Sequence, residues 1–426
     1  MILTRMVEQS ELTRPLFVRA TGAGAGGIAV LVLEGADVRQ LLQPLFRAKR
    51  ALADVGGGEL LFGRLADATG AIVDEVLAVP IGKKESETGN EQLELSCHGG
   101  VGALAAVEEA LLAAGFGRGR HTDLLRRGHL NGVLSLVTIE ARLRLPAAVT
   151  ARQAAFLVGH AQLQQRWERL GFDMALGMRQ SSSAWRGKLL EEADTALREF
   201  RGAKALLSQH HVVLLGPVNA GKSSLANCLA RAERHIVCAA PGTTRDRLDT
   251  PIEMRGLSLL VTDTAGVRSA LDDVEREGQK RGHAAAHTAD LRLVVLDGSQ
   301  PPADADVDLI ARTAAAGPLL LVLNKQDLGV DENATGLGFV AGRDPHTVSA
   351  KTGAGLDKLM EDIERLLLGG LAPAPGVPFT RRQAGLIEQL KHGLEKNQDG
   401  TELLFFVRRL VGTRPDAVEL AAVLAE

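Results

Sequence analysis

An eight-residue loop rich in glycine is the segment of this sequence best suited to hold a phosphate group. Residues 216–223 read Gly-Pro-Val-Asn-Ala-Gly-Lys-Ser and fit the pattern G-x-x-x-x-G-K-[ST], in which backbone N–H groups surround a polyphosphate. An apolar strand-like segment (211–215) precedes the loop, and helical apolar spacing follows it, so the phosphates would meet a helix N-terminus. The pattern assigns Lys222 to the β- and γ-phosphates and Ser223 to Mg²⁺. The binding residues predicted in this segment are Asn219, Ala220, Gly221, Lys222, Ser223 and Ser224.

Three further short motifs follow predicted strands in the order that a guanine-nucleotide domain requires. Asp-Thr-Ala-Gly at 263–266 offers a carboxylate for the Mg²⁺ water shell and an amide for the γ-phosphate. In Asn-Lys-Gln-Asp at 324–327, Asp327 can accept both N–H donors of a guanine edge, whereas adenine presents the opposite pattern. Ser-Ala-Lys at 349–351 suits a backbone contact to the guanine oxygen. The order of the motifs, each after a strand, predicts GTP and GDP as ligands rather than ATP. The predicted contacts are Asp263, Thr264, Ala265, Gly266, Asn324, Lys325, Asp327, Ser349, Ala350 and Lys351.

The chemistry of hydrolysis leaves two interpretations open. Ras-like enzymes carry a glutamine after Asp-Thr-Ala-Gly that orients the attacking water, and here that position is Val267, which forms no hydrogen bond. Either hydrolysis is lost or another residue orients the water. The acidic segment 272–277 offers carboxylates for that purpose, and it is equally typical of a solvated helix start.

Several segments together resemble the MnmE (TrmE) family of tRNA modification GTPases. Within the nucleotide-binding part these are Asn-Ala-Gly-Lys-Ser-Ser at 219–224, Pro-Gly-Thr-Thr-Arg-Asp at 241–246, and Asp-Thr-Ala-Gly-Val-Arg at 263–268 with Val-Glu-Arg at 274–276. Segments 20–29, 93–100 and 130–131 match landmarks of the family in the same order, more loosely. The resemblance covers nearly the whole chain.

This resemblance implies a K⁺ ion beside the phosphates, where other GTPases place an arginine finger. An arginine finger is worth roughly 10³–10⁵ in rate, and a cation there would supply similar charge stabilisation. The positions matching the K⁺ ligands of the family are Asn219, Cys238, Ala240 and Thr243. Thr244 matches the Mg²⁺-binding threonine, and Glu275 matches the glutamate that orients the attacking water. The resemblance therefore implies that hydrolysis is retained, with Glu275 as the catalytic residue.

Composition describes a globular protein of the cytoplasm. The 426 residues are 45% hydrophobic and 24% charged, and the net charge of −3 argues against a strongly basic nucleic-acid surface. The N-terminus lacks the apolar core of a signal peptide, and no apolar stretch is long enough to cross a bilayer, so we expect no membrane association. The three cysteines show no C-x-x-C spacing, which argues against a disulfide framework and fits a reducing compartment.

The pattern of elements predicts a multidomain α/β protein. Short strands at 28–33, 72–79 and 93–96, mixed with helices, indicate an N-terminal TrmE-like α+β domain over 1–120. Helical periodicity, as in 151–170 and 189–207, dominates 121–208 and returns in 372–426. Between them lies the Ras-like P-loop domain, 209–370, followed by a linker of Gly, Ala and Pro at 369–377. As in the resembled family, we expect the GTPase domain to be inserted into one discontinuous helical domain.

The departures from the family concern a different ligand, the folate one-carbon donor that the family holds in its N-terminal domain. This sequence has Val32 where the family has an arginine, Asn90 where it has an acidic residue, and Val133 where it has a lysine. It also has His-Thr-Asp-Leu at 121–124 where the family has Pro-Gly-Glu-Phe. Charged groups able to clamp a folate are therefore absent, and we expect no bound folate. The family's Cys-x-Gly-Lys ending is also absent from 418–426, so we expect the chemistry of that tail to be lost.

Two functions of different classes remain compatible with the sequence. The first is a K⁺-stimulated GTPase that drives modification of the tRNA wobble uridine with an MnmG-like flavoprotein, as the resemblance implies. The second is a GTP-dependent switch or scaffold that has no role in tRNA modification, which the departures favour. The resemblance also implies a homodimer formed through the N-terminal domain.

Overall fold

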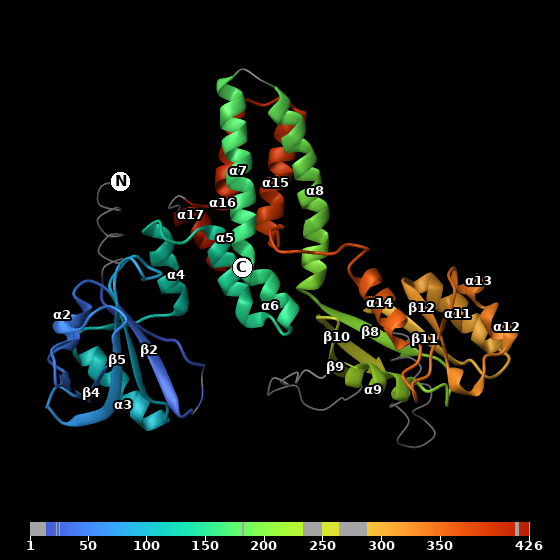
Figure 1. Ribbon diagram of the computed structural model, residues 1–426, viewed down its shortest axis with the longest axis horizontal. Helices are drawn as coiled ribbons and strands as arrows, with labels where there is room; N and C mark the ends of the chain where they lie inside the picture. The colour runs from blue at the N-terminus through green and yellow to red at the C-terminus, as the bar shows by residue number, and fades with distance from the viewer. Residues whose placement is uncertain are drawn as a thin grey trace. The chain divides into compact units, whose positions relative to one another are not determined.

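The computed structural model describes residues 14–22, 24, 26–180, 183–232, 249–263, 288–413 and 417–425. The chain separates into two compact units, Met1–Glu140 with Arg408–Glu426 and Ala141–Val407. Each unit contains one β-sheet (Figure 1). The finer predicted division into three domains stays a prediction.

The sheet of the first unit has seven strands in the order β3-β4-β5-β6-β2-β1-β7. Neighbours pair antiparallel except β1 with β7, which are parallel. The predicted strands at 28–33, 72–79 and 93–96 are confirmed as β2, β5 and β6. The strands are β1 (Leu16–Arg19), β2 (Ile28–Glu34), β3 (Phe46–Ala48), β4 (Leu61–Ala66), β5 (Ile72–Ile81), β6 (Gln92–His98) and β7 (Gly117–Arg118).

Buried and exposed side chains alternate along these strands, so the sheet has one buried face. Helix α3 (Val101–Ala113) covers that face, and its Leu104, Val107 and Leu111 join the main core of the unit. On the opposite face, Phe62 and Leu77 stand directly across from each other on β4 and β5 and are 54% and 36% exposed. Such a half-buried sheet is typical of antiparallel strands. The other helices are α2 (Val38–Leu42), α4 (His121–Leu130), α5 (Leu136–Arg144), which crosses the unit boundary, and α17 (Ala417–Ala425).

The sheet of the second unit is mainly parallel, in the order β13-β12-β11-β8-β10-β9, with β9 antiparallel at one edge. The inner strands β11 and β12 are apolar runs buried on both faces, as parallel strands covered by helices require. The strand predicted at 211–215 is confirmed as β8, the strands predicted before the motifs at 263 and 324 are confirmed as β10 and β12, and β9 and β11 are additional. The strands are β8 (Gln209–Leu215), β9 (Asp249–Met254), β10 (Leu257–Asp263), β11 (Leu291–Asp297), β12 (Leu319–Asn324) and β13 (His346–Thr347).

Helices of this sheet lie on its two faces (Figure 1). Ile310 and Ala334, from α11 and α12, pack against alternate residues of β11 and β12, while α14 contacts β11 and α9 contacts β10. The helices are α9 (Lys222–Ala232), α11 (Asp304–Ala316), α12 (Glu332–Thr335), α13 (Gly338–Ala341) and α14 (Leu356–Leu367).

Long helices complete the second unit. Figure 1 shows α7, α8 and α15 side by side, and Lys391 of α15 pairs with Asp194 of α8 at 2.7 Å. The helical pattern over 151–170 is divided in the structure, because the chain turns at Gly159. A Cβ there would lie 2.3 Å from Cβ of Pro375, so only glycine permits this close approach. The helices are α6 (Ala151–Val158), α7 (His160–Arg179), α8 (Ala184–Leu206), α15 (Arg381–Glu395) and α16 (Gly400–Val411), whose end crosses the unit boundary.

Among the described residues, no helix is both long enough and apolar enough to cross a membrane.

Candidate functional site

The glycine-rich loop connects the end of β8 to the start of α9, as its pattern predicts. Gly221 has a φ of +90°, and a Cβ at this position would lie 2.1 Å from Nδ2 of Asn324. Asn219 also adopts a left-handed conformation, with a φ of +62°, and is exposed at the loop surface. This backbone path leads into the N-terminus of α9, where unpaired N–H groups favour an anion.

Lys222 is buried in this loop, with 5% of its surface exposed. Its ammonium group donates hydrogen bonds to the carbonyl oxygens of Gly216 at 2.9 Å and Pro217 at 2.7 Å. The cation therefore lies inside the curve of the loop, where a bound polyphosphate would need it.

Ser223 and Asp263 bring a hydroxyl and a carboxylate together beside the loop. The Ser223 hydroxyl donates a hydrogen bond to Oδ2 of Asp263, which is the last residue of β10. Mg²⁺ prefers hard oxygen ligands, so these two side chains fit the ion that the fold family implies. They would hold it directly or through its water molecules.

Asn324 links the phosphate loop to the loop predicted to hold the guanine base. Its Nδ2 donates to the carbonyl oxygen of Ala220, and its Oδ1 accepts from the amide N–H of Ala350, each at 2.9 Å. Asn324 lies at the end of β12 and is 2% exposed. A single buried side chain thus sets the spacing of the two loops.

The carboxylate of Asp327 is oriented by contacts with two residues of the 349–351 motif. Its Oδ1 accepts from the Ser349 hydroxyl at 2.7 Å, and Lys351 Nζ lies 4.0 Å from its Oδ2. The Ser349 hydrogen bond is the main reason that the pKa of Asp327 lies below its usual value, with a smaller contribution from Lys351. An ionised carboxylate at this point suits the two N–H donors of a guanine edge.

Asp297 is a residue of this site that the sequence reasoning missed. It ends β11, and its Oδ2 pairs with Nζ of Lys325 at 2.7 Å. Burial raises the pKa of Asp297, but hydrogen bonds from Lys325 and Ser299 outweigh burial and hold it low. The available signal was its place directly after the apolar run 293–296, the same position that Asp263 and Asn324 occupy in their strands.

The structure thus brings the described site residues together at the carboxyl ends of β8, β10 and β12. Ser224 lies exposed in the first turn of α9. The remaining predicted site residues lie outside the described residues: Cys238, Ala240, Thr243, Thr244, Thr264, Ala265, Gly266 and Glu275.

Comparison with known proteins agrees with this geometry. Residues 211–325 match the family model of 50S ribosome-binding GTPases, and residues 16–133 match that of the GTP-binding protein TrmE N-terminus. The tRNA modification GTPase MnmE of Syntrophotalea carbinolica is 34% identical, covering 72% of both chains. Its counterpart in Roseiflexus castenholzii is 32% identical, over 95% of this chain and 92% of its own length. The chain belongs to the MnmE family.

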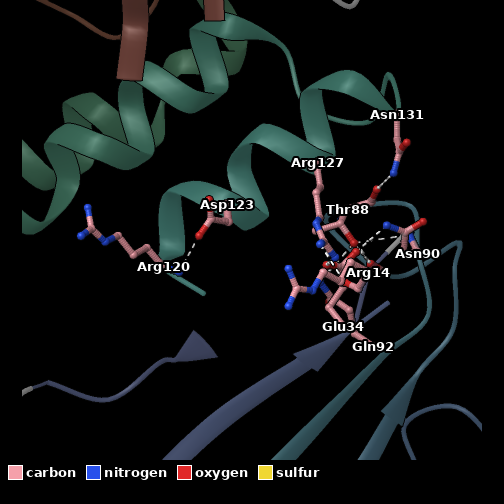
Figure 2. Close-up of polar contacts among 10 residues, drawn as sticks. Arg14, Glu34, Thr88, Asn90, Gln92, Arg120, Asp123, Arg127 and Asn131 are labelled. Carbon is pink, nitrogen blue, oxygen red and sulfur yellow. Dashed lines mark hydrogen bonds and ion pairs between the residues drawn. The ribbon is translucent and has the colours of Figure 1, made fainter. Parts of the chain in front are cut away.

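A network of polar side chains occupies the MnmE-type N-terminal domain (Figure 2). Glu34, at the end of β2, is fully buried and forms an ion pair with Arg127 of α4, which is itself buried. Asn90 donates a hydrogen bond from Nδ2 to Oε1 of Glu34. Asn131 Nδ2 donates to the carbonyl oxygen of Thr88 at 2.7 Å. These hydrogen bonds and the ion pair connect the loop before β6 with β2 and helix α4.

The positions at which the sequence departs from the MnmE pattern differ in their surroundings. Val32 packs against the buried cluster of Leu16, Val18 and Leu124. Asn90 bonds Glu34, and Val133 is 47% exposed. At the start of α4, the Asp123 carboxylate accepts a hydrogen bond from the backbone N–H of Arg120 at 2.7 Å, which caps the helix (Figure 2).

Asp297→Asn tests the missed ion pair. We expect GDP affinity to fall roughly tenfold, because a hydrogen bond to a charged group is worth about 1.5–3 kcal/mol and each 1.4 kcal/mol is tenfold. Asp308→Asn, at an exposed position on α11, is the matched control and should bind as the unmodified protein does. Fluorescent-GDP titration measures both, and equal affinity of the two variants would contradict the role of Asp297.

Proposed function

We propose that this protein hydrolyses GTP in the modification of the tRNA wobble uridine, with tRNA and an MnmG-like flavoprotein as partners. The observation that carries the proposal is the convergence of Lys222, Ser223 with Asp263, and Asn324 with Asp327 at one edge of the sheet. Each group has the chemistry that one part of Mg²⁺–GTP needs: the phosphates, the metal and the base. Membership of the MnmE family over nearly the whole chain supports the tRNA substrate.

The deciding experiment measures wobble-uridine modification in total tRNA from a strain that lacks this gene. We expect the modified nucleoside to disappear and to return when the gene is supplied on a plasmid. A plasmid copy with Lys222→Ala should fail to restore it, because that variant lacks the phosphate-binding cation. Unchanged modification in the deletion strain would refute the role in tRNA chemistry.

We further propose that Asn219 and backbone carbonyls at Cys238, Ala240 and Thr243 hold a K⁺ ion beside the phosphates. The exposed, left-handed position of Asn219 at the loop surface supports this assignment. The ion would supply positive charge to the transition state, as an arginine finger does elsewhere. Thr244 would add a Mg²⁺ ligand, and Glu275 would orient the attacking water in place of the missing glutamine.

Steady-state hydrolysis of GTP tests these two roles. Turnover should rise when K⁺ replaces Na⁺, and Asn219→Ala should remove the difference. Glu275→Ala should slow turnover while GTP binding stays near its normal affinity, because the role proposed for Glu275 is to orient water and not to bind the nucleotide. Equal rates in both salts would exclude the K⁺ site, and normal turnover of Glu275→Ala would exclude that residue as the catalytic one.

We also infer that the folate site of the family is lost in this protein. Val32 lies in an apolar cluster, and Asn90 and Arg127 are engaged by Glu34, so these groups do not fit a folate carboxylate or pterin. This observation favours a second candidate function, a GTP-dependent switch or scaffold with no role in tRNA modification. Calorimetry with a reduced folate should show no binding, and micromolar affinity would overturn the inference.

The arrangement of the family supports two more structural proposals. The Lys391–Asp194 pair, and a hydrogen bond from Arg186 to the carbonyl oxygen of Gln398 at 2.6 Å, support one helical domain interrupted by the GTPase domain. The exposed pair Phe62 and Leu77 supports a homodimer through the N-terminal domain.

Light scattering after gel filtration should give the mass of a dimer, and Phe62→Lys should shift it toward the monomer because a charge would enter the interface. Lys84→Glu, on a nearby loop, is the control for an altered surface charge. A monomeric mass for the unmodified protein would exclude the dimer.

A further inference from the structure

The β9–β10 hairpin connects the two segments that carry the remaining catalytic assignments. Thr243 and Thr244 precede β9 in the sequence, and Glu275 follows β10. Strand β10 ends at Asp263, within the Mg²⁺ site. Any contact that fixes this hairpin therefore constrains the strand that carries Asp263.

The open end of the hairpin is held by a chain of three polar side chains. The Thr262 hydroxyl donates to Oδ1 of Asp249 at 2.5 Å, and Nε2 of His211 lies 2.7 Å from the same hydroxyl oxygen. Because Thr262 already donates its proton to Asp249, His211 is the donor in the second bond. The strands β9, β10 and β8 are thus joined next to Asp263.

The opposite end is a tight two-residue turn with an unusual sequence. Arg255 and Gly256 have φ angles of +50° and +75°, and Met254 pairs with Leu257 across the turn. Two positive φ angles define a type I′ turn, which favours Asn-Gly or Gly-Gly. A non-glycine residue held in such a region is strained and persists only where its surroundings enforce it.

A cluster from two other elements encloses this turn. Arg152, on the first turn of α6, donates from Nη1 to the carbonyl oxygen of Arg255 at 2.9 Å and to Oε1 of Glu364 at 2.5 Å. Arg255 donates from Nε to Oε2 of the same Glu364, on α14, also at 2.5 Å. One carboxylate therefore receives both guanidinium groups. Burial raises the pKa of Glu364, but these two hydrogen bonds outweigh burial and hold it low, so the carboxylate is ionised.

The start of α6 contacts the turn a second time. The Thr150 hydroxyl donates to the carbonyl oxygen of Gly256 at 2.7 Å and accepts from the N–H of Gln153, which caps α6. A Cβ on Gly256 would lie 2.5 Å from Cβ of Arg152, so glycine is required here for both conformation and space.

Gln153 connects the same helix start to the phosphate loop. It is 2% exposed and donates from Nε2 to the carbonyl oxygen of Leu206, the last residue of α8, at 2.9 Å. Strand β8 begins three residues later and leads to the phosphate loop. One turn of α6 thus contacts both chain paths into the nucleotide site.

We propose that Arg152 is a positioning residue for GTP hydrolysis, which with Glu364 locks the Arg255–Gly256 turn to α6 and transmits the nucleotide state to that helix. The lock fixes the hairpin, whose strand β10 ends at Asp263 in the Mg²⁺ site. The kinetic part of this inference rests on the proposed GTPase function, and the structural part does not.

A double-mutant cycle tests the kinetic part. Arg152→Ala and Glu364→Gln should each lower kcat by roughly tenfold to a hundredfold, the scale of a misplacement remote from the chemistry. The double variant should lose less rate than the product of the two single losses, because both substitutions remove the shared Arg152–Glu364 contact. GDP affinity should stay within threefold, since neither residue lies at the phosphates or the base. Arg152→Lys, which keeps the charge and one donor, should recover part of the rate.

Arg198→Ala is the matched control. Arg198 is an arginine on α8 whose guanidinium bonds Thr195 of the same helix at 3.1 Å, so its loss should leave kcat unchanged. A kcat of Arg152→Ala equal to that of the control would overturn the kinetic part, and so would additive effects in the double variant.

Hydrogen exchange tests the structural part without turnover. In the unmodified protein, replacing GDP by a non-hydrolysable GTP analogue should change amide protection both in the hairpin and in residues 151–156. In Arg152→Ala the change should persist in the hairpin and vanish from α6. A change in α6 that survives this substitution would overturn the transmission, whereas a protein that exchanges normally but never hydrolyses GTP would refute only the proposed function.

Discussion

The side-chain amide of Asn324 is the contact on which the geometry of the nucleotide site depends. It donates to the phosphate loop at Ala220 and accepts from the base loop at Ala350, using both ends of one planar group. Planarity fixes the separation of the two loops, and burial protects both bonds from water. The position of β12 between β11 and β13 explains how this is achieved, because a strand paired on both sides cannot easily shift its last residue. Gly221 completes the constraint, since any side chain there would collide with the amide.

The nucleotide-binding part of the fold was largely predictable from the sequence. Parallel strands that are buried on both faces have continuous apolar sequences, which makes them easy to recognise. Their carboxyl ends meet at one edge of the sheet, so motifs that follow successive strands are expected to lie close together. Asp297 was missed because it is a single residue and belongs to no longer motif. Its role becomes visible only from its ion pair with Lys325 in the structure. Strand β9 was missed because an edge strand carries no continuous apolar run, and its sequence Asp-Thr-Pro-Ile-Glu-Met mixes polar and apolar residues. The division of the helix at Gly159 depends on Pro375, more than two hundred residues away, which no local pattern contains.

In the N-terminal domain, too, a contact between residues distant in the sequence could not be predicted from local patterns. The sequence identified charges absent at Val32, Asn90 and Val133, but it did not indicate that Glu34 would take a buried position against Arg127. A buried ion pair gains little net stability over a well-packed apolar pair, and losing one partner is costly because the other charge remains. Glu34 and Arg127 therefore constrain each other: neither position tolerates a neutral residue while the other keeps its charge. This coupling arises from the fold and leaves no trace in the spacing of either residue.

The bonds of Lys222 have a consequence for how this loop takes up a ligand. Its ammonium group is already coordinated by two carbonyl oxygens of the loop that it serves. An arriving polyphosphate therefore finds the cation already desolvated and oriented, with little side-chain entropy left to lose. The contribution of Lys222 to phosphate affinity therefore comes from the attraction between its charge and the phosphate, and not from ordering a flexible side chain. A ligand with little negative charge gains correspondingly little here, because the two carbonyl bonds of the cation are already made.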